Sequence, residues 1–323
     1  MDSLVEPDSN DKSPSFAPAK LLLRLTQVSQ MSVLLIRTLS RALSWLPFHA
    51  NQSLGATLGR LAWRLNGKLR RITEINIDLC YSQLPEHERR ELVRNSLIET
   101  GRQLTESAWI WHRPIEQSDE KIVEIRGQNW LDEAQQSGKG CLMVSPHLGN
   151  WELCSLPLSR QEPFTYFYRK PRQAGMDKVL LRWRAHLRGQ PATLDVSGIK
   201  QGLKILKAGG LVGILPDQEP DRNNGHFAPF FNKRTLTMTL LSRLANRSGA
   251  VVLFCVVERL PRGKGWIFHI IPADKAVASR DIDEATIALN RGVERCIELC
   301  PAQYLWSYKR FNTPEDGARS PYR

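Results

Sequence analysis

The pattern of apolar and polar positions divides the chain into a helical part, up to about residue 115, and an α/β part that follows. Residues 20–46 predict one helix closed by Pro47, and helical spacing continues through residues 50–112. Short apolar runs then predict strands at residues 122–125, 141–144, 164–168, 211–215, 251–257 and 266–271. Helical patterns separate most of them, at residues 131–137, 176–187, 200–207, 236–248 and 283–299. We therefore predict an α/β fold with a mixed central sheet flanked by helices.

The predicted N-terminal helix, residues 19–47, is amphipathic and basic. Its longest uncharged run, residues 25–36, spans roughly 18 Å as a helix, against about 30 Å for the hydrocarbon core of a bilayer. A full crossing would bury an arginine, so the pattern favours a helix that lies in the membrane interface. The alternative is a basic helix packed on its own domain.

The predicted domain organisation follows from these shifts in composition. Residues 1–18 are rich in Ser, Pro and Asp and predict a disordered tail, whose acidic start argues against a secretory signal. The membrane-associated helix at 19–47 precedes one domain at 48–312, which is helical over 48–115 and an α/β core over 116–312. Residues 313–323 form a C-terminal tail.

Composition narrows the possible partners. The chain has 323 residues, 41% hydrophobic and 24% charged, which is ordinary for a globular protein. Its net charge of +12 favours acidic partners such as nucleic acid, anionic lipid or an acidic protein. Six scattered cysteines without a Cys-x-x-Cys pair predict free thiols in a reducing compartment. The phosphate-loop, zinc-helix, nucleophile-elbow and dinucleotide-binding motifs do not occur in the sequence.

The candidate chemistry lies where the predicted strand at 141–144 ends. His147 follows that strand, Gly149 and Asn150 suit a sharp turn, and Glu152 comes next. Ligands of open α/β sheets bind at this edge. On one helix His147 and Glu152 would point about 140° apart, but across a strand–turn–helix corner the carboxylate can fold back onto the imidazole. Such a contact fixes the imidazole tautomer and raises its basicity, which suits acyl transfer without a covalent intermediate.

The His–acid spacing alone is a weak signal, because a chain with seven histidines and 33 acidic residues produces it by chance. His269 and Asp274 repeat the spacing without a Gly or Asn to make the turn, and we interpret His269 as structural. The surrounding motif therefore has to carry the argument for His147.

The run HLGNWEL at residues 147–153 resembles the acyltransferase motif of bacterial lipid A biosynthesis enzymes, the late lauroyl/myristoyl acyltransferases. These enzymes belong to the lysophospholipid acyltransferase-like superfamily. Further blocks agree in order, namely YRKP at 168–171, LPDQ at 215–218, GHFAPFF at 225–231 and WSYKRF at 306–311. The resemblance covers roughly residues 25–312.

The resemblance implies a role for each matching residue. His147 would be the general base and Glu152 its orienting carboxylate. Arg169 would stabilise developing negative charge or hold a phosphate, and Asp217 and Gln218 would border the site as substrate-binding residues. The structural alternatives are that Arg169 is an ordinary surface residue and that Asp217 only makes a turn.

The resemblance also implies the reaction and the partners. The chain is similar to O-acyltransferases that work on the cytoplasmic face of the bacterial inner membrane. Their acyl donor is an acyl carrier protein thioester, and their acceptor is a hydroxyl of a phosphorylated glycolipid, the lipid A precursor. The product of such a transfer is an acyloxyacyl group. No metal or redox cofactor is implied. The basic run at 169–188 and the anionic membrane surface fit these partners. A glycerolipid, aminolipid or mannolipid acceptor, a catalytically silent scaffold and a nucleic-acid-binding protein remain alternatives, although no nucleic-acid-binding motif is present.

Overall fold

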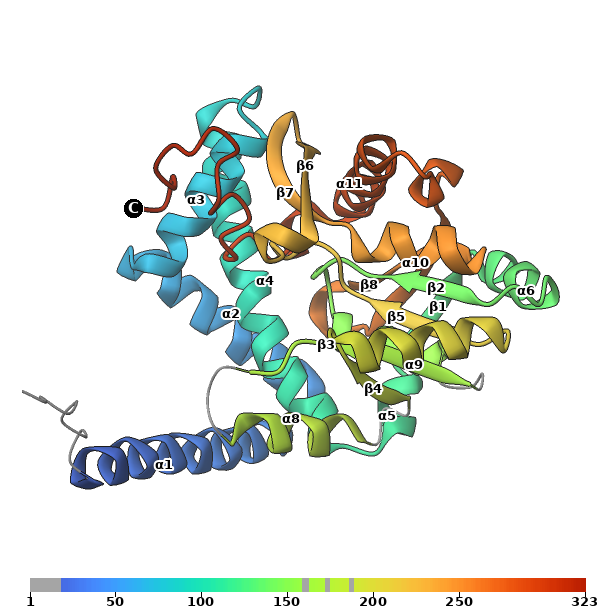
Figure 1. Cartoon of the computed structure of the whole chain (residues 1–323). Helices are drawn as coiled ribbons and strands as arrows, with labels where there is room; N and C mark the ends of the chain where they lie inside the picture. The colour runs from blue at the N-terminus through green and yellow to red at the C-terminus, as the bar shows by residue number, and fades with distance from the viewer. Residues whose placement is uncertain (1–18, 159–162, 172–174, 186–188) are drawn as a thin grey trace, which may run out of the picture.

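A central sheet with helices packed on it organises the protein (Figure 1). The computed structural model describes residues 19–158, 163–171, 175–185 and 189–323, with side chains from Met31 onward other than those of residues 157 and 158. The disordered tail predicted at residues 1–18 lies outside the described residues. The sheet has seven strands in the order β1-β9-β8-β2-β5-β3-β4, and all neighbours are parallel except β8 and β9. The predicted α/β fold with a mixed sheet is confirmed.

Six of the seven strands coincide with the predicted apolar runs. The strands are β1 (Ile122–Arg126), β2 (Cys141–Val144), β3 (Phe164–Tyr168), β4 (Gln190–Thr193), β5 (Leu211–Ile214), β8 (Val251–Arg259) and β9 (Trp266–Pro272). Strand β4 is the one that the pattern did not predict. It is a short edge strand that contains a proline and two exposed residues, so it has no apolar run.

Alternate residues of the central strands point to opposite faces of the sheet and belong to two separate hydrophobic cores. Leu142 and Val144 of β2 belong to one core, while Cys141 and Met143 belong to the other. Helices α9 (Val196–Lys207), α10 (Leu240–Ser248) and α11 (Ile282–Leu299) contribute to the first core. Helix α6 (Gln128–Gln136) covers the opposite face. The central strands β2, β5 and β8 are buried on both faces, as their near-continuous apolar runs predict, whereas the edge strands β1 and β4 are largely exposed.

The N-terminal helices form a unit on one side of the sheet (Figure 1). They are α1 (Ala19–Ser44), α2 (Phe48–Leu65), α3 (Lys68–Cys80) and α4 (Glu86–His112). The short α5 (Ile115–Asp119) then leads from α4 to β1. Glycines let α2 and α4 approach closely, because a Cβ atom on Gly101 would lie 2.1 Å from the backbone oxygen of Gly55. No helix within the described residues is both long enough and apolar enough to cross a bilayer.

A two-stranded hairpin corrects one predicted helix. The pattern predicts helix over residues 236–248, but residues up to Met238 belong to β7 (Lys233–Met238), which pairs with β6 (Gly225–Phe230). Helix α10 begins only at Leu240. Leu236 is buried as a strand residue, and the threonines beside it favour the extended conformation because they branch at Cβ.

The chain end also packs on the helical unit. Tyr322, in the segment predicted as a tail, is buried and its hydroxyl donates to Asn76 of α3 while accepting from the backbone N–H of Phe311. Two further short helices flank the site described next, α7 (Ser155–Leu158) and α8 (Met176–Arg184).

Candidate active site

The two central side chains of the site, His147 and Asp217, follow the ends of two parallel strands at one edge of the sheet. Strands β2 and β5 pair in register, with Val144 opposite Ile214. His147 lies three residues beyond the end of β2, and Asp217 lies three residues beyond the end of β5. Each of these two residues directly follows a proline. Because the two residues lie the same number of positions beyond the ends of two strands that pair in register, the imidazole and the carboxylate come together.

Asp217 holds the imidazole of His147 at two points. The Nδ1 atom of His147 lies 2.8 Å from Oδ1 of Asp217, and the backbone N–H of His147 donates to Oδ2 at 2.9 Å. An ionised carboxylate only accepts hydrogen bonds, so Nδ1 carries the proton in the neutral ring. Nε2 then has a free lone pair, and the side-chain amide of Gln218 donates to it at 3.2 Å. The ring is held in the tautomer that a general base requires.

The Asp217 carboxylate stays ionised although it is buried. Burial alone would raise its pKa, but the hydrogen bonds and positive potential from His147 outweigh burial and lower the pKa below the ordinary value. Tyr304 packs beside Asp217, where burial and the neighbouring negative charge raise the pKa of its hydroxyl well above 10. The phenol is therefore neutral, and it adds no competing charge next to the imidazole.

Glu152 does not form the predicted bond to His147 within the described residues. Burial would raise the pKa of Glu152, but its ion pair with Arg184 and the indole N–H of Trp111, 3.0 Å away, lower it. The Nε atom of Arg184 donates to Glu152 at 2.8 Å. The corner after Asn150 is a 3-10 turn over Trp151–Cys154, and it directs Glu152 toward α4 and α8. Both carboxylate oxygens are therefore engaged away from the imidazole.

Trp111 and Arg184 are parts of the site that the sequence did not reveal. Trp111 lies in the last turn of α4 and Arg184 ends α8, so both are far from Glu152 along the chain. The Trp111 ring stacks on that of Trp183 with centroids 4.8 Å apart and an interplanar angle of 17°. Nothing in the local pattern connects these segments. The equal offset of His147 and Asp217 after two apolar runs is visible in the sequence, but the pairing of those two strands, which brings the side chains together, is not.

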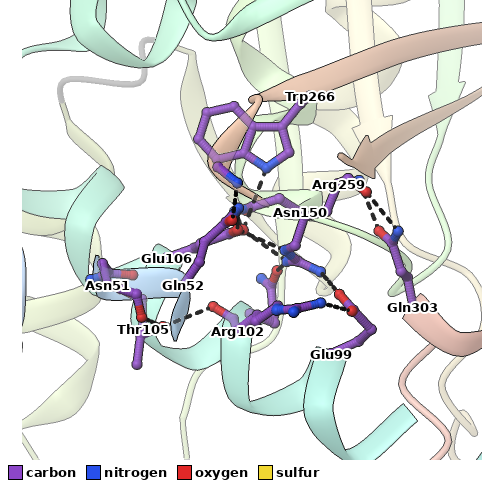
Figure 2. A network of polar contacts seen from close by, with 12 residues as sticks. Asn51, Gln52, Glu99, Arg102, Thr105, Glu106, Asn150, Arg259, Trp266 and Gln303 are labelled. Carbon is purple, nitrogen blue, oxygen red and sulfur yellow. Dashed lines mark hydrogen bonds and ion pairs between the residues drawn. The ribbon is translucent and has the colours of Figure 1, made fainter. Parts of the chain in front are cut away.

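A buried polar network anchors the loop that follows His147 (Figure 2). Glu106 of α4 is fully buried and accepts hydrogen bonds from Asn150 at 2.8 Å and from two nitrogens of Arg259 at 2.7 and 2.8 Å. Gln52 of α2 donates to the same carboxylate at 2.6 Å. Asn150 stands three residues after His147, so this network ties the loop that follows His147 to both α4 and β8.

Backbone bonds fix the same loop from its other side. The carbonyl of His147 accepts from Leu305 at 2.9 Å, and the backbone N–H of Asn150 donates to Val257 at 2.8 Å. Gly149 has φ +61°, and a Cβ atom there would lie 1.9 Å from the carbonyl oxygen of Val257. Only glycine satisfies both conditions. The loop is held rigidly, which preserves the geometry of the imidazole.

A cavity of about 620 Å³ opens beside His147. Aromatic side chains of β3 and the side chains of Trp151, Glu152 and Arg184 line it. Gln218 lines it as well, and the exposed Arg169 stands at its wall without an ion pair to a described residue. The predicted site residues His147, Glu152, Arg169 and Gln218 thus share one cavity, with the buried Asp217 behind the imidazole.

Two other sequence interpretations can be compared with the structure. His269 is buried in β9 and its Nε2 lies 2.8 Å from Glu258, so it takes part in a structural contact and not in this cavity. Within the described ranges no group of three or more His, Cys, Asp or Glu side chains has the geometry of a metal site. All six cysteines are buried free thiols.

Comparison with known proteins gives one consistent family. The family described as bacterial lipid A biosynthesis acyltransferase matches residues 20–313. The chain is 31% identical over 281 residues to a lipid A biosynthesis lauroyltransferase of Escherichia coli K12, which covers 86% of this chain and 90% of that protein. It is 28% identical to a lipid A biosynthesis palmitoleoyltransferase of the same organism over the same shares, and 25% identical to its myristoyltransferase over 83% of each chain.

Proposed function

The chain belongs to the bacterial lipid A biosynthesis acyltransferases, and from this premise we propose that it transfers a fatty acyl group from an acyl carrier protein thioester to a hydroxyl of a lipid A precursor. The family makes the chain an acyltransferase of lipid A synthesis, which sets aside the nucleic-acid-binding and scaffold alternatives. The acceptor hydroxyl belongs to a hydroxyacyl chain, so the product is an acyloxyacyl glycolipid.

In the proposed mechanism His147 is the general base. The acceptor hydroxyl displaces the Gln218 amide from Nε2 of His147 and gives its proton to that nitrogen as its oxygen attacks the thioester carbonyl. The new C–O bond forms, the C–S bond breaks, and the imidazolium returns the proton to the departing thiolate. Asp217 stabilises the imidazolium through the bond to Nδ1. The acyl group passes directly to the acceptor, without a covalent intermediate on the enzyme.

Glu152 and Arg169 complete the proposed site. Glu152 holds Arg184 and Trp111 at the cavity wall, and its negative charge attracts the imidazolium that forms during turnover without a direct hydrogen bond to it. Arg169, exposed at the cavity, is placed to stabilise the negative charge on the carbonyl oxygen or to bind a donor phosphate. The exposed Lys170 beside it adds positive charge at the cavity, which favours encounter with an acidic carrier protein.

Membrane association is the second part of the proposal. From Met31 onward helix α1 leaves large apolar side chains in solvent, including Leu35 at 59% and Leu39 at 54% exposure, and Trp45 just beyond its end is exposed as well. A helix that exposes such residues beside arginines suits the interface of an anionic bilayer. We place the enzyme on the cytoplasmic face of the inner membrane, where its cysteines remain reduced and a carrier protein is accessible.

The observation that carries the catalytic proposal is the contact between His147, which lines the cavity, and the buried Asp217 behind it. The test is turnover by the purified protein with acyl carrier protein and coenzyme A thioesters of several chain lengths and a tetra-acylated lipid A precursor. Mass spectrometry should find one added acyl group, and His147→Ala should abolish the addition. Acylation of a glycerolipid, aminolipid or mannolipid, with the lipid A precursor unchanged, would reject the proposed acceptor.

A further inference from the structure

A second hollow of about 930 Å³ lies between α1, the end of α4 and α8, and we call it the α1–α8 groove. On α1 its lining residues recur every three or four positions from Leu34 to Ala42, so they occupy one face of that helix, and Trp45 lines the groove just beyond the helix end. On α8 Lys178 and Arg182 are one turn apart and face the same space. Two helices therefore present opposing walls.

The walls of the α1–α8 groove are fixed by hydrogen bonds from the end of α4. Oγ of the buried Ser40 lies 2.9 Å from Nε2 of His112. The Nε atom of Arg113 donates to the backbone carbonyl of Ser44 at 2.8 Å, which caps the last turn of α1. The groove is thus part of the folded protein and does not need a ligand to form.

The Arg and Lys side chains that line the α1–α8 groove give it a positive charge. Arg37 and Arg41 of α1 and Lys178 and Arg182 of α8 are exposed, and none of them makes an ion pair with a described residue. No acidic side chain is among the described residues that line the groove. Guanidinium groups bind phosphate oxygens in a bidentate manner, so this lining is complementary to a phosphate-bearing ligand.

Tryptophans form the wall between the α1–α8 groove and the catalytic cavity. Trp45 is 71% exposed at the groove, and Trp111 and Trp183 form a stacked wall. The indole N–H of Trp111 donates to Glu152, which lines the catalytic cavity. One aromatic wall therefore separates the two hollows. Indole faces also suit the apolar faces of sugar rings, whereas a phosphate alone would need only the cations.

We propose that the α1–α8 groove binds the phosphorylated sugar headgroup of the acceptor while its hydroxylated acyl chain reaches His147 in the neighbouring cavity. The inference rests on the proposed function and assigns a site to the anionic end of the acceptor. A bilayer phospholipid is the weaker candidate, because a hollow this large that borders the catalytic wall exceeds what one lipid phosphate needs. An acidic carrier protein needs a broad surface of about 800 Å² per partner, whereas the α1–α8 groove is a concave hollow between helices.

The direct test measures binding of the water-soluble, deacylated headgroup of the lipid A precursor to the full chain in detergent. Lys178→Gln combined with Arg182→Gln should weaken binding at least tenfold, and removal of phosphate from the headgroup should abolish the difference between variant and wild type. Lys204→Gln combined with Lys207→Gln on α9 is the control, since it removes the same charge from exposed residues outside both hollows. Equal binding by the groove variant and the control overturns the proposal.

Kinetics and vesicle binding separate this proposal from the proposed function. The groove variant should raise KM for the phosphorylated acceptor at least tenfold and leave kcat and the KM of the acyl donor unchanged. A loss confined to binding of anionic vesicles, or to the donor KM, assigns the groove to a phospholipid or to the carrier protein and overturns the proposal. Groove-dependent headgroup binding without turnover would reject the proposed function alone. Turnover with unchanged headgroup binding would reject the groove alone.

Discussion

Removal of Arg259 tests whether the buried network holds the fold together at the catalytic loop. Arg259→Met deletes two bonds to Glu106, one to Glu99 at 3.0 Å and one to Gln103 at 2.9 Å. Glu106, which is 0% exposed, would keep its charge without a cation beside it. Because breaking a buried ion pair leaves an uncompensated charge, we expect a loss of about 3–5 kcal/mol in the free energy of unfolding.

The assay is urea unfolding in detergent, followed by tryptophan fluorescence. The matched control is Arg234→Met, which breaks an Arg–Glu pair with Glu315 whose side chains are 49% and 42% exposed. An exposed pair of this kind contributes about 0–1 kcal/mol. The double variant Arg259→Met with Glu106→Gln should recover about 1–3 kcal/mol relative to Arg259→Met alone, because the orphaned charge is gone. Equal losses in Arg259→Met and Arg234→Met would refute the reasoning.

Three further predictions concern packing, pH and the membrane. Gly101→Ala should lower the free energy of unfolding by about 1–3 kcal/mol, because the added methyl group meets the backbone of α2. The control Gly67→Ala, with open space around it, should lower it by less than about 0.5 kcal/mol. Equal losses in the two variants would contradict the close contact between α2 and α4. The pKa of Glu152 is lowered in the folded state, so its contribution to stability is present above the ordinary pKa and is lost as pH falls below it. Glu152→Gln should therefore flatten the fall in unfolding free energy below about pH 4.5, and an unchanged slope would contradict the ion pair. Leu35→Ser with Leu39→Ser should reduce cosedimentation with anionic vesicles while kcat in detergent stays unchanged, and undiminished cosedimentation would contradict the role of α1.

The central strands of the sheet were predictable because they are buried on both faces and therefore appear as apolar runs, whereas the exposed edge strand β1 was predictable from its isoleucines and valine, which favour the extended conformation. Strand β4 and the β6–β7 hairpin were not, because their residues are polar, branched or proline-containing and obtain their conformation from pairing with neighbours. The start of helix α10 at Leu240 was not predicted correctly for the same reason. A helical period continued into residues 236–238, but cross-strand bonds with β6 override it.

The site was predictable where it depends on one segment. His147 follows from its motif at a strand end, and Asp217 was recognised only as a residue that borders the site. The bond between them depends on the register of β2 and β5, which the order of elements along the chain does not specify. Glu152 was expected to contact His147, but its position is set by Arg184 and Trp111, from helices brought in by the tertiary fold. Its part in catalysis remains a prediction.

The account depends most on Asp217 as the group that orients His147, and kcat of Asp217→Asn at neutral pH tests it most directly. The asparagine can occupy the same space but does not stabilise the imidazolium, and its amide can present an N–H to Nδ1. We predict that kcat falls about 10²- to 10⁴-fold, close to the loss in His147→Ala, with the KM of the acyl donor unchanged. Wild-type kcat in Asp217→Asn, together with a large loss in Glu152→Gln, would contradict the account.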